Sequence, residues 1–217
     1  MPLLTHDLAA RNIRVVEYGE ILNRRFGYPI VLSTFTWGVP DSNLSEVGDL
    51  LLAHGFQAGG IRREDTQFYG VLEAGGLMFL YGQSRIHLVP LSFLLLSLDD
   101  CQEVYSSANS RDNTLIPKIQ PYLISLIRRI MALPTGFHRL IIEHHLLIFF
   151  DYVLFPRLPE DEDEEHESEE HFQQRVEQAI SYVREWDWKP EELKYLEITE
   201  RLIRDCSQIS KITECNK

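Results

Sequence analysis

The hydrophobic pattern near the N-terminus predicts a strand, a short helix and a second strand in succession. Ile13–Tyr18 is a short β-branched run that ends at Gly19. Glu20–Phe26 has room for two helical turns before a glycine and a proline stop it. Tyr28–Trp37 is rich in β-branched and aromatic residues, which favours a strand that is largely buried. We expect this unit to be the frame of the fold.

The remaining elements follow from the same kind of periodicity. In the first half of the chain we expect a helix over Leu3–Ala10, a helix from Leu44 to Gly55 with a capping box at Asn43 and Glu46, strands over Thr66–Glu73, Leu77–Tyr81 and Arg85–Val89, and a buried helix over Leu91–Leu98. In the second half the apolar positions recur at helical spacing and predict helices over Leu115–Leu133, His138–Phe155, Glu169–Trp186 and Glu191–Cys206.

This order of elements predicts an α+β protein. We expect a small mixed β-sheet flanked by helices, formed by residues 1–111, and a C-terminal helical layer formed by residues 112–217. An acidic loop over residues 156–170 interrupts the helical layer. At this length the two layers are expected to form one compact unit.

Charge and cysteine content limit the classes of partner. The net charge is −12, but nine carboxylates lie between Glu160 and Glu170, and the rest of the chain carries only −3. No basic stripe is present, so we expect no nucleic-acid partner. The three cysteines are far apart and lack metal-ligand spacing. Residues 1–12 lack an apolar leader and no apolar stretch is long enough for a bilayer, so we expect a cytoplasmic protein without a membrane partner.

Several short motifs, in this order, resemble the fungal nucleotidyltransferase-like proteins over roughly residues 10–155. They are Gly19-Glu20 after a strand, Phe26-Gly27-x-Pro29, Val39-Pro40-Asp41 at the end of the second strand, Ile86-His87-Leu88-Val89-Pro90, and Leu115-Ile116-Pro117-Lys118. The resemblance implies the nucleotidyltransferase fold, a small mixed sheet with a helical domain behind it. In active members a Gly-Ser pair contacts nucleotide phosphate, and two carboxylates on the next strand hold Mg²⁺ ions.

The chain departs from that pattern at the residues that carry the chemistry. Glu20 stands at the serine position, and Thr34 and Thr36 stand at the positions of the two carboxylates. Hydroxyl groups do not replace two carboxylates as Mg²⁺ ligands, and Glu20 would repel a triphosphate. We therefore expect a degenerate nucleotidyltransferase fold that holds no metal or other cofactor and does not transfer nucleotides.

If the cleft persists without its metals, we expect it to bind an apolar small molecule. Glu17, Glu20 and His87 are then the candidate catalytic residues, because each can supply a proton or a hydrogen bond. The candidate substrate-binding residues are Tyr18, Thr34, Thr36 and Trp37. Such a site suits a metal-independent isomerase or cyclase of specialised metabolism.

Each of these residues also has a purely structural interpretation. Glu17 can be ion-paired to an arginine, and Glu20 can simply stabilise a helix N-terminus. Thr34 and Thr36 are good strand formers, and His87 can be a hydrogen-bonded histidine within the fold. The corresponding alternative function is a non-catalytic interaction module that meets its partner through the helical layer or the acidic loop.

Overall fold

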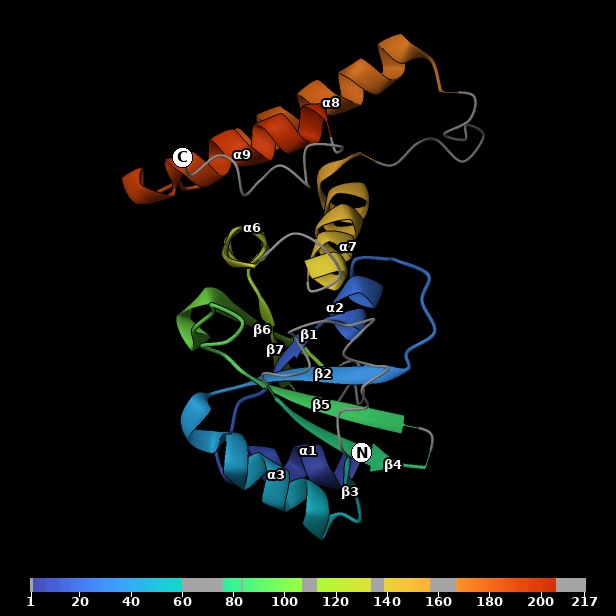
Figure 1. Ribbon diagram of the computed structural model, residues 1–217, viewed down its shortest axis with the longest axis vertical. Coiled ribbons are helices and arrows are strands. Elements are labelled where there is room, and N and C mark those ends of the chain that lie inside the picture. The colour runs from blue at the N-terminus through green and yellow to red at the C-terminus, as the bar shows by residue number, and fades with distance from the viewer. Residues whose placement is uncertain are drawn as a thin grey trace.

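The computed structural model describes residues 2–59, 76–82, 84–106, 113–133, 139–156 and 167–205. These residues form a seven-stranded mixed sheet with helices on both faces and two further helices stacked beyond one face (Figure 1). The predicted α+β class, a mixed sheet flanked by helices with a C-terminal helical layer, is confirmed. Within these ranges no helix is both long enough and apolar enough to cross a membrane.

The sheet is built from strands that are mostly short. In chain order they are β1 (Val16–Tyr18), β2 (Thr34–Val39), β3 (Gln57–Gly59), β4 (Leu77–Tyr81), β5 (Ser84–Pro90), β6 (Cys101–Tyr105) and β7 (Asn113–Pro117). Their order across the sheet is β3-β4-β5-β2-β1-β7-β6. The pairs β2–β5 and β1–β7 are parallel, and the other four pairs are antiparallel.

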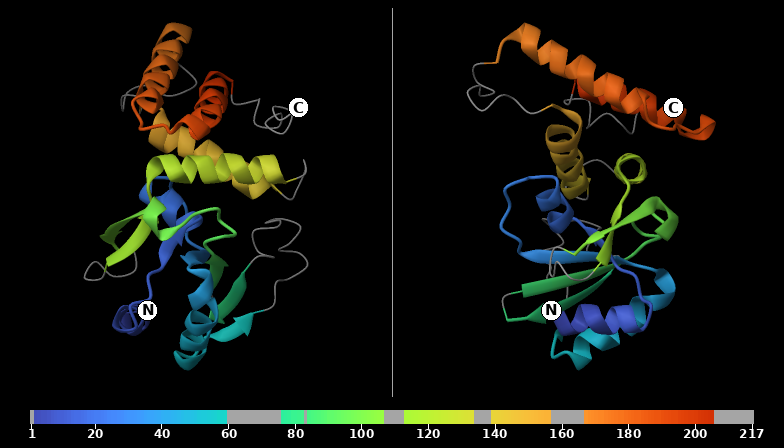
Figure 2. Two further views of the ribbon diagram at one scale, coloured as in Figure 1. Left: turned by 90° about the vertical axis from the view of Figure 1, so that its left-hand side faces the viewer. Right: turned by 180° about the vertical axis from the view of Figure 1, so that it is seen from behind.

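Two hydrophobic clusters, one on each face, hold the sheet between helices. Helices α1 (Pro2–Ala10) and α3 (Leu44–Ala53) cover one face, and α2 (Glu20–Arg25), α6 (Ile119–Ala132) and α7 (Leu140–Phe149) cover the other (Figure 2). Trp37 and Val39 of β2 pack in the α1/α3 cluster. Val16 and Tyr18 of β1 pack in the α6/α7 cluster. Successive strand residues point to opposite faces, so these four side chains fix the orientation of their neighbours.

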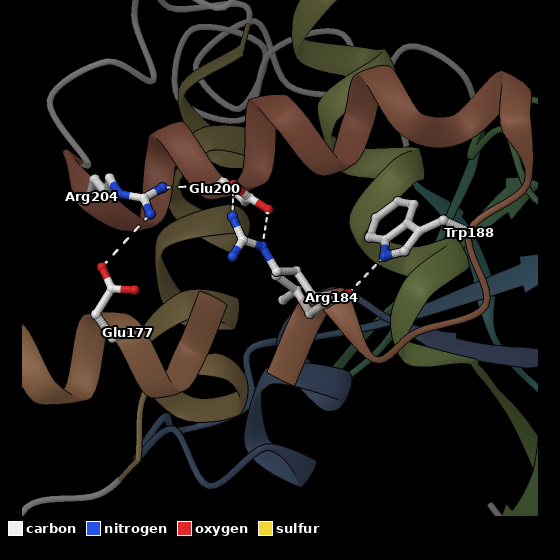
Figure 3. A network of polar contacts seen from close by, with 6 residues as sticks. Glu177, Arg184, Trp188, Glu200 and Arg204 are labelled. Carbon is white, nitrogen blue, oxygen red and sulfur yellow. Dashed lines mark hydrogen bonds and ion pairs between the residues drawn. The ribbon is translucent and has the colours of Figure 1, made fainter. Parts of the chain in front are cut away.

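The outermost layer consists of α8 (Glu169–Arg184) and α9 (Leu193–Arg204), which lie side by side (Figures 1 and 2). Their buried faces include Val176, Val183 and Leu202. A surface network joins the two helices, because Arg184 forms two hydrogen bonds with Glu200, and Arg204 pairs with Glu177 and Glu200 (Figure 3).

A single arginine joins the end of the α7 region to the start of α8. After α7 the chain continues as a π-helical turn, Phe150–Leu154, and reaches Pro156. The Arg175 side chain donates to the Pro156 carbonyl at 2.9 Å and to the Glu167 carboxylate at 2.8 Å. The two residues that border segment 157–166 are therefore held by the same guanidinium group.

Strands β1 and β2 both begin later in the chain than the sequence predicts. Strand β1 begins at Val16 rather than Ile13, and β2 begins at Thr34 rather than Tyr28. Residues 28–33 have high strand propensity but lie in no strand, and the Val31 side chain is 90 % exposed. High strand propensity is not sufficient to form a strand when no neighbouring strand pairs with the segment.

Strands β3, β6 and β7 were not predicted, and one predicted helix is absent. Strands β6 and β7 pair with each other, and Leu115 of β7 lies beside Val16 of β1, so the helix expected from Leu115 begins only at Ile119. Leu91–Leu98 forms turns instead of a helix, and Leu95 has a φ of 55°. The turns bury Leu91, Leu94 and Leu96 in the α6/α7 cluster, whereas Leu95 and Leu98 are exposed.

Most of the other predicted helices and strands are confirmed, whereas the predicted helix cap and part of the predicted loop are not. Helices α1, α2, α3, α8 and α9 and strands β4 and β5 are confirmed, whereas the Asn43 side chain does not cap α3. Glu169 and Glu170 of the expected acidic loop lie in α8. The strand expected over Thr66–Glu73 and residues 157–166 of the acidic loop lie outside the described residues.

Candidate functional site

Thr36 and His87 lie side by side at the centre of the sheet. They are register partners on the parallel strands β2 and β5, and both point toward α6 and α7, because their neighbours Trp37, Ile86 and Leu88 pack on the other face. Both side chains are buried, with 6 % and 2 % exposed. Thr34 shares this face and is half-buried.

His87 is a neutral histidine in this position. Burial lowers its pKa from 6.5 to about 4, because the imidazolium form loses its hydration. Within the described ranges its Nε2 atom has no hydrogen-bond partner, and a Cβ added to Gly76 would lie 2.8 Å from it. The predicted role of His87 as a proton shuttle stays a prediction.

Gly19 brings the turn between β1 and α2 onto Thr36. It has a φ of 62°, and a Cβ at this position would lie 3.1 Å from Thr36 Oγ1. A side chain here would be disfavoured by the backbone conformation and by the close approach alike. The positive φ and the close approach to Thr36 therefore explain why a glycine stands at position 19.

The carboxylate of Glu20 is occupied by the start of β2. It accepts hydrogen bonds from the backbone N–H groups of Ser33 at 2.9 Å and Thr34 at 3.1 Å, and from the Ser33 hydroxyl at 3.0 Å. The backbone N–H groups of Ser33 and Thr34 are thus already bonded to a carboxylate of this chain, that of Glu20. This arrangement disfavours a phosphate at the same place.

Glu17 lies on the opposite face of the sheet from Tyr18 and Thr36. Its register partner is Trp37, and the Glu17 side chain is almost fully buried. Arg25 of α2 donates from Nε to the Glu17 carboxylate at 2.5 Å and from a terminal nitrogen to the Tyr105 carbonyl. The interpretation in which an arginine pairs with Glu17 is therefore what the structure shows.

A cavity of about 420 Å³ opens beside Glu17 and Trp37. It lies between the end of α1, strand β1 and the β6–β7 hairpin, and its lining is formed by Leu8, Ala9, Asn12, Ile13, Arg14, Val15, Glu17, Trp37, Glu103, Ser106, Asn113, Thr114 and Leu115. Leucine, isoleucine and tryptophan side chains supply the apolar part of this wall. Carboxylate, amide, hydroxyl and guanidinium groups supply the polar part, so the cavity is more polar than the expected apolar cleft.

The structure does not bring all seven predicted site residues together. Tyr18, Thr34, Thr36 and His87 belong to the α6/α7 face, and Glu20 lies at the start of α2 on that side. Glu17 and Trp37 belong to the cavity on the α1/α3 side. The physical reason is the two-residue period of a strand, which sends adjacent residues to opposite faces.

The cavity residues contributed by β6 and β7 had no signal in the sequence. Glu103 accepts from the Asn113 side-chain amide at 3.0 Å, and the Thr114 hydroxyl donates to the Val15 carbonyl at 3.3 Å. Both strands are short and lie far along the chain from β1. The sequence indicated the ion pair between Glu17 and Arg25 only indirectly, because a carboxylate on a buried strand needs a partner.

No cluster of three or more histidine, cysteine, aspartate or glutamate side chains within the described ranges is placed to hold a metal ion. Thr34 and Thr36 do share a face of β2, as the resemblance requires of its two carboxylates, but they offer hydroxyl oxygens only. The residues present therefore do not fit the pair of Mg²⁺ ions that active nucleotidyltransferases use.

Comparison with known proteins gave matches to solved structures only. No protein-family model and no curated protein matches the chain. The antibiotic-resistance factor ANT(2'')-Ia is similar in structure, with 8% sequence identity and a TM-score of 0.44 over 99% of this chain and 94% of that chain. An antigenic nucleotidyltransferase-like protein from Paracoccidioides brasiliensis is similar at 11% identity and a TM-score of 0.44, over 90% of this chain and 89% of that chain. At these scores neither likeness assigns an activity or a source organism to this chain.

Proposed function

We propose that this chain is a degenerate nucleotidyltransferase-like protein that binds a small molecule in the cavity beside Glu17 and Trp37. The cavity of about 420 Å³ is the observation that carries the proposal. Its volume falls within the range of small-molecule sites, and it combines an apolar wall with a few placed polar groups. It holds two of the seven residues that the sequence nominated.

The proposed ligand is a small molecule that combines an apolar part with several polar groups. Leu8, Ile13 and Leu115 would contact its apolar body, and Asn12, Asn113 and Glu103 would meet its polar groups. Where the bound molecule reacts, the proposed chemistry is a metal-independent isomerisation or cyclisation. Glu17 is the candidate to hold or move a proton in that reaction.

Nucleotide transfer is disfavoured by three residues on the other face. Thr34 and Thr36 offer no carboxylate for a metal ion, and Glu20 already accepts the backbone N–H groups of Ser33 and Thr34. A phosphate placed there would meet a carboxylate instead of free donors. These contacts support a binding protein or a different reaction over nucleotidyl transfer.

The proposal is tested by filling the cavity and then capturing its ligand. Ala9 lies in α1 and lines the cavity, so Ala9→Trp should block it. Ala53 lies exposed at the end of α3 and away from the cavity, so Ala53→Trp is the matched control. Each immobilised protein is incubated with a metabolite extract, and the retained compounds are identified by mass spectrometry.

The expected result is a compound retained by the wild-type protein and by Ala53→Trp but not by Ala9→Trp. Both variants should keep the wild-type circular dichroism spectrum, because both substitutions are made at exposed positions of helices. Equal retention by all three proteins, or retention by none, would count against binding in this cavity.

The alternative function, a non-catalytic interaction module, is favoured by exposed apolar side chains on the outermost helices. Phe172 and Tyr182 of α8 and Leu193 of α9 are 38 %, 40 % and 47 % exposed. Apolar groups of this size at a surface are typical of docking sites when they gather in one patch. Loss of a protein partner on Tyr182→Ser and Leu193→Ser, with metabolite capture unchanged, would support this alternative.

A further inference from the structure

Arg129 of α6 is a buried guanidinium group, and no carboxylate of the described residues neutralises it. Its side chain is 5 % exposed in the layer between α6 and the sheet. One terminal nitrogen donates to the Phe93 carbonyl, and the guanidinium carbon lies 4.5 Å from the centre of the Phe93 ring. The Nε atom is buried and has no hydrogen-bond partner in the part of the chain that the structure describes. Among the described residues, no aspartate or glutamate pairs with Arg129.

The groups around Arg129 are neutral, so they leave its charge in place. Tyr122, Ser125 and Arg129 follow one stripe of α6, three and four residues apart. The Ser125 hydroxyl donates to the Leu94 carbonyl at 2.6 Å. Tyr122 is fully buried, its hydroxyl has no hydrogen-bond partner among the described residues, and its ring lies 5.4 Å from that of Tyr18.

The other two groups near this stripe, Tyr18 and His145, are also uncharged at neutral pH. Burial raises the pKa of Tyr18, which the charge of Arg129 only partly offsets. Burial, together with the charges of His144 and Arg129, lowers the pKa of His145 to about 3. The layer between α6 and the sheet therefore carries one positive charge and no described negative one.

Such an arrangement is costly unless something completes it. A charge removed from water without a partner of opposite sign destabilises the folded state. The contacts with Phe93 offset part of this, because a carbonyl and an aromatic face both interact favourably with a cation. The unbonded Nε–H of Arg129 still points to a missing acceptor.

We propose that a single small monovalent anion binds in the buried layer at Arg129. The guanidinium supplies the charge and the free Nε–H donor, and the Tyr122 hydroxyl is the second unbonded polar group of the same stripe. The surrounding layer is closely packed, with the Tyr122 ring in contact with Tyr18 at 5.4 Å and with Phe26 at 5.9 Å, so the proposal is restricted to an anion as small as a halide or a formate. This site lies on the opposite face of the sheet from the Glu17 cavity and does not rest on the proposed function.

The test is an anion titration of thermal stability at constant ionic strength. Sodium gluconate, whose anion is too large for the site, is replaced stepwise by sodium chloride, bromide or formate. Total sodium stays fixed, so screening of the net charge of −12 does not change. A halide-only response would indicate a spherical anion, and a formate response would indicate a site for a carboxylate group.

Two variants of adjacent arginines provide the comparison. Arg129→Met removes the proposed ligand-binding group and retains most of its apolar volume. Arg128→Met changes the neighbouring residue of α6, which points to solvent. For the wild type and Arg128→Met we expect a saturable rise in melting temperature of about 5 °C, which is what occupancy far above the dissociation constant supplies for a chain of this size. For Arg129→Met we expect no rise.

A direct measurement keeps the proposal testable if Arg129→Met does not fold. The ³⁵Cl resonance should broaden on addition of wild-type protein, and bromide should reverse this broadening by competition. The proposal is overturned if neither halide nor formate raises the melting temperature of the wild type above that in gluconate. An equal rise in all three proteins would overturn it as well.

Discussion

The Glu20 carboxylate accepts hydrogen bonds from both the backbone N–H and the hydroxyl of Ser33, at 2.9 and 3.0 Å. These contacts join the first turn of α2 to the residue that precedes β2. We expect Glu20→Ala to lower the free energy of unfolding by about 1–2 kcal/mol, because charged acceptors make the stronger hydrogen bonds but this one is partly exposed. Urea denaturation measures this change in the free energy of unfolding.

The control for this substitution is Asp49→Ala on the exposed side of α3, which should change stability by less than about 0.5 kcal/mol. If both variants are equally stable, the contacts with Ser33 do not hold β2 in place.

The second prediction concerns nucleotide binding. Thr34 and Thr36 offer hydroxyl groups and no carboxylate for Mg²⁺, and Glu20 accepts the backbone N–H groups of Ser33 and Thr34. We expect isothermal titration calorimetry with ATP and Mg²⁺ to show no binding in the micromolar range. A micromolar isotherm that EDTA abolishes would contradict the proposal that this chain has lost nucleotidyl transfer.

The third prediction concerns the ion pair between Glu17 and Arg25. Glu17 is buried and Arg25 is 23% exposed, so removing one partner leaves a charge that water reaches poorly. We expect Glu17→Gln and Arg25→Gln each to cost about 2 kcal/mol, with a coupling energy above about 1 kcal/mol in a double-mutant cycle.

The surface pair Arg11–Glu46 is the matched control for that cycle. Its side chains are 54% and 43% exposed and its atoms are 3.2 Å apart. Its coupling energy should stay below about 1 kcal/mol because solvent screens it. Equal coupling in the two cycles would show that burial of Glu17 adds nothing to its pairing.

The fourth prediction is a loss of stability in mild acid. Burial lowers the pKa of His87 to about 4, and that of His145 is lowered to about 3. Below about pH 6.5 the unfolded chain binds protons at these two residues while the folded chain does not. The free energy of unfolding should therefore be highest above pH 6.5 and fall as the pH drops toward 4, by roughly 1.4 kcal/mol per pH unit for each histidine.

Urea denaturation between pH 7 and pH 5 measures this slope. His87→Leu should remove about half of it, whereas His6→Gln, at an exposed position of α1, should leave it unchanged. A wild-type stability that is flat over this range would mean that the two histidines are protonated in the folded chain.

How far the sequence predicts this fold depends on whether an element has its own periodicity. Helices α8 and α9 each show an apolar stripe, and both were found. Strand β7 is a short apolar run directly before α6, and only its partners on either side distinguish it from a first helical turn. Residues 28–33 show the converse, since their composition favours a strand and no neighbouring strand pairs with them.

The sequence predicts part of the candidate site in the same way. Glu17 and Trp37 were identified from residue type and strand position, and they are neighbours at the cavity. That Glu17 and Tyr18 face opposite sides also follows from strand geometry alone. The contributions of Asn113 and Thr114 depend on how β7 pairs with β1, which no local pattern encodes.

The Arg175 side chain, which bonds to both Pro156 and Glu167, has a practical consequence for protein engineering. Because one guanidinium group bonds to a residue on each side of segment 157–166, a single substitution at Arg175 would release both of its borders at once. A label on the protein should therefore be placed away from Arg175, Pro156 and Glu167, and an exposed helix position such as Ala53 is preferred for it.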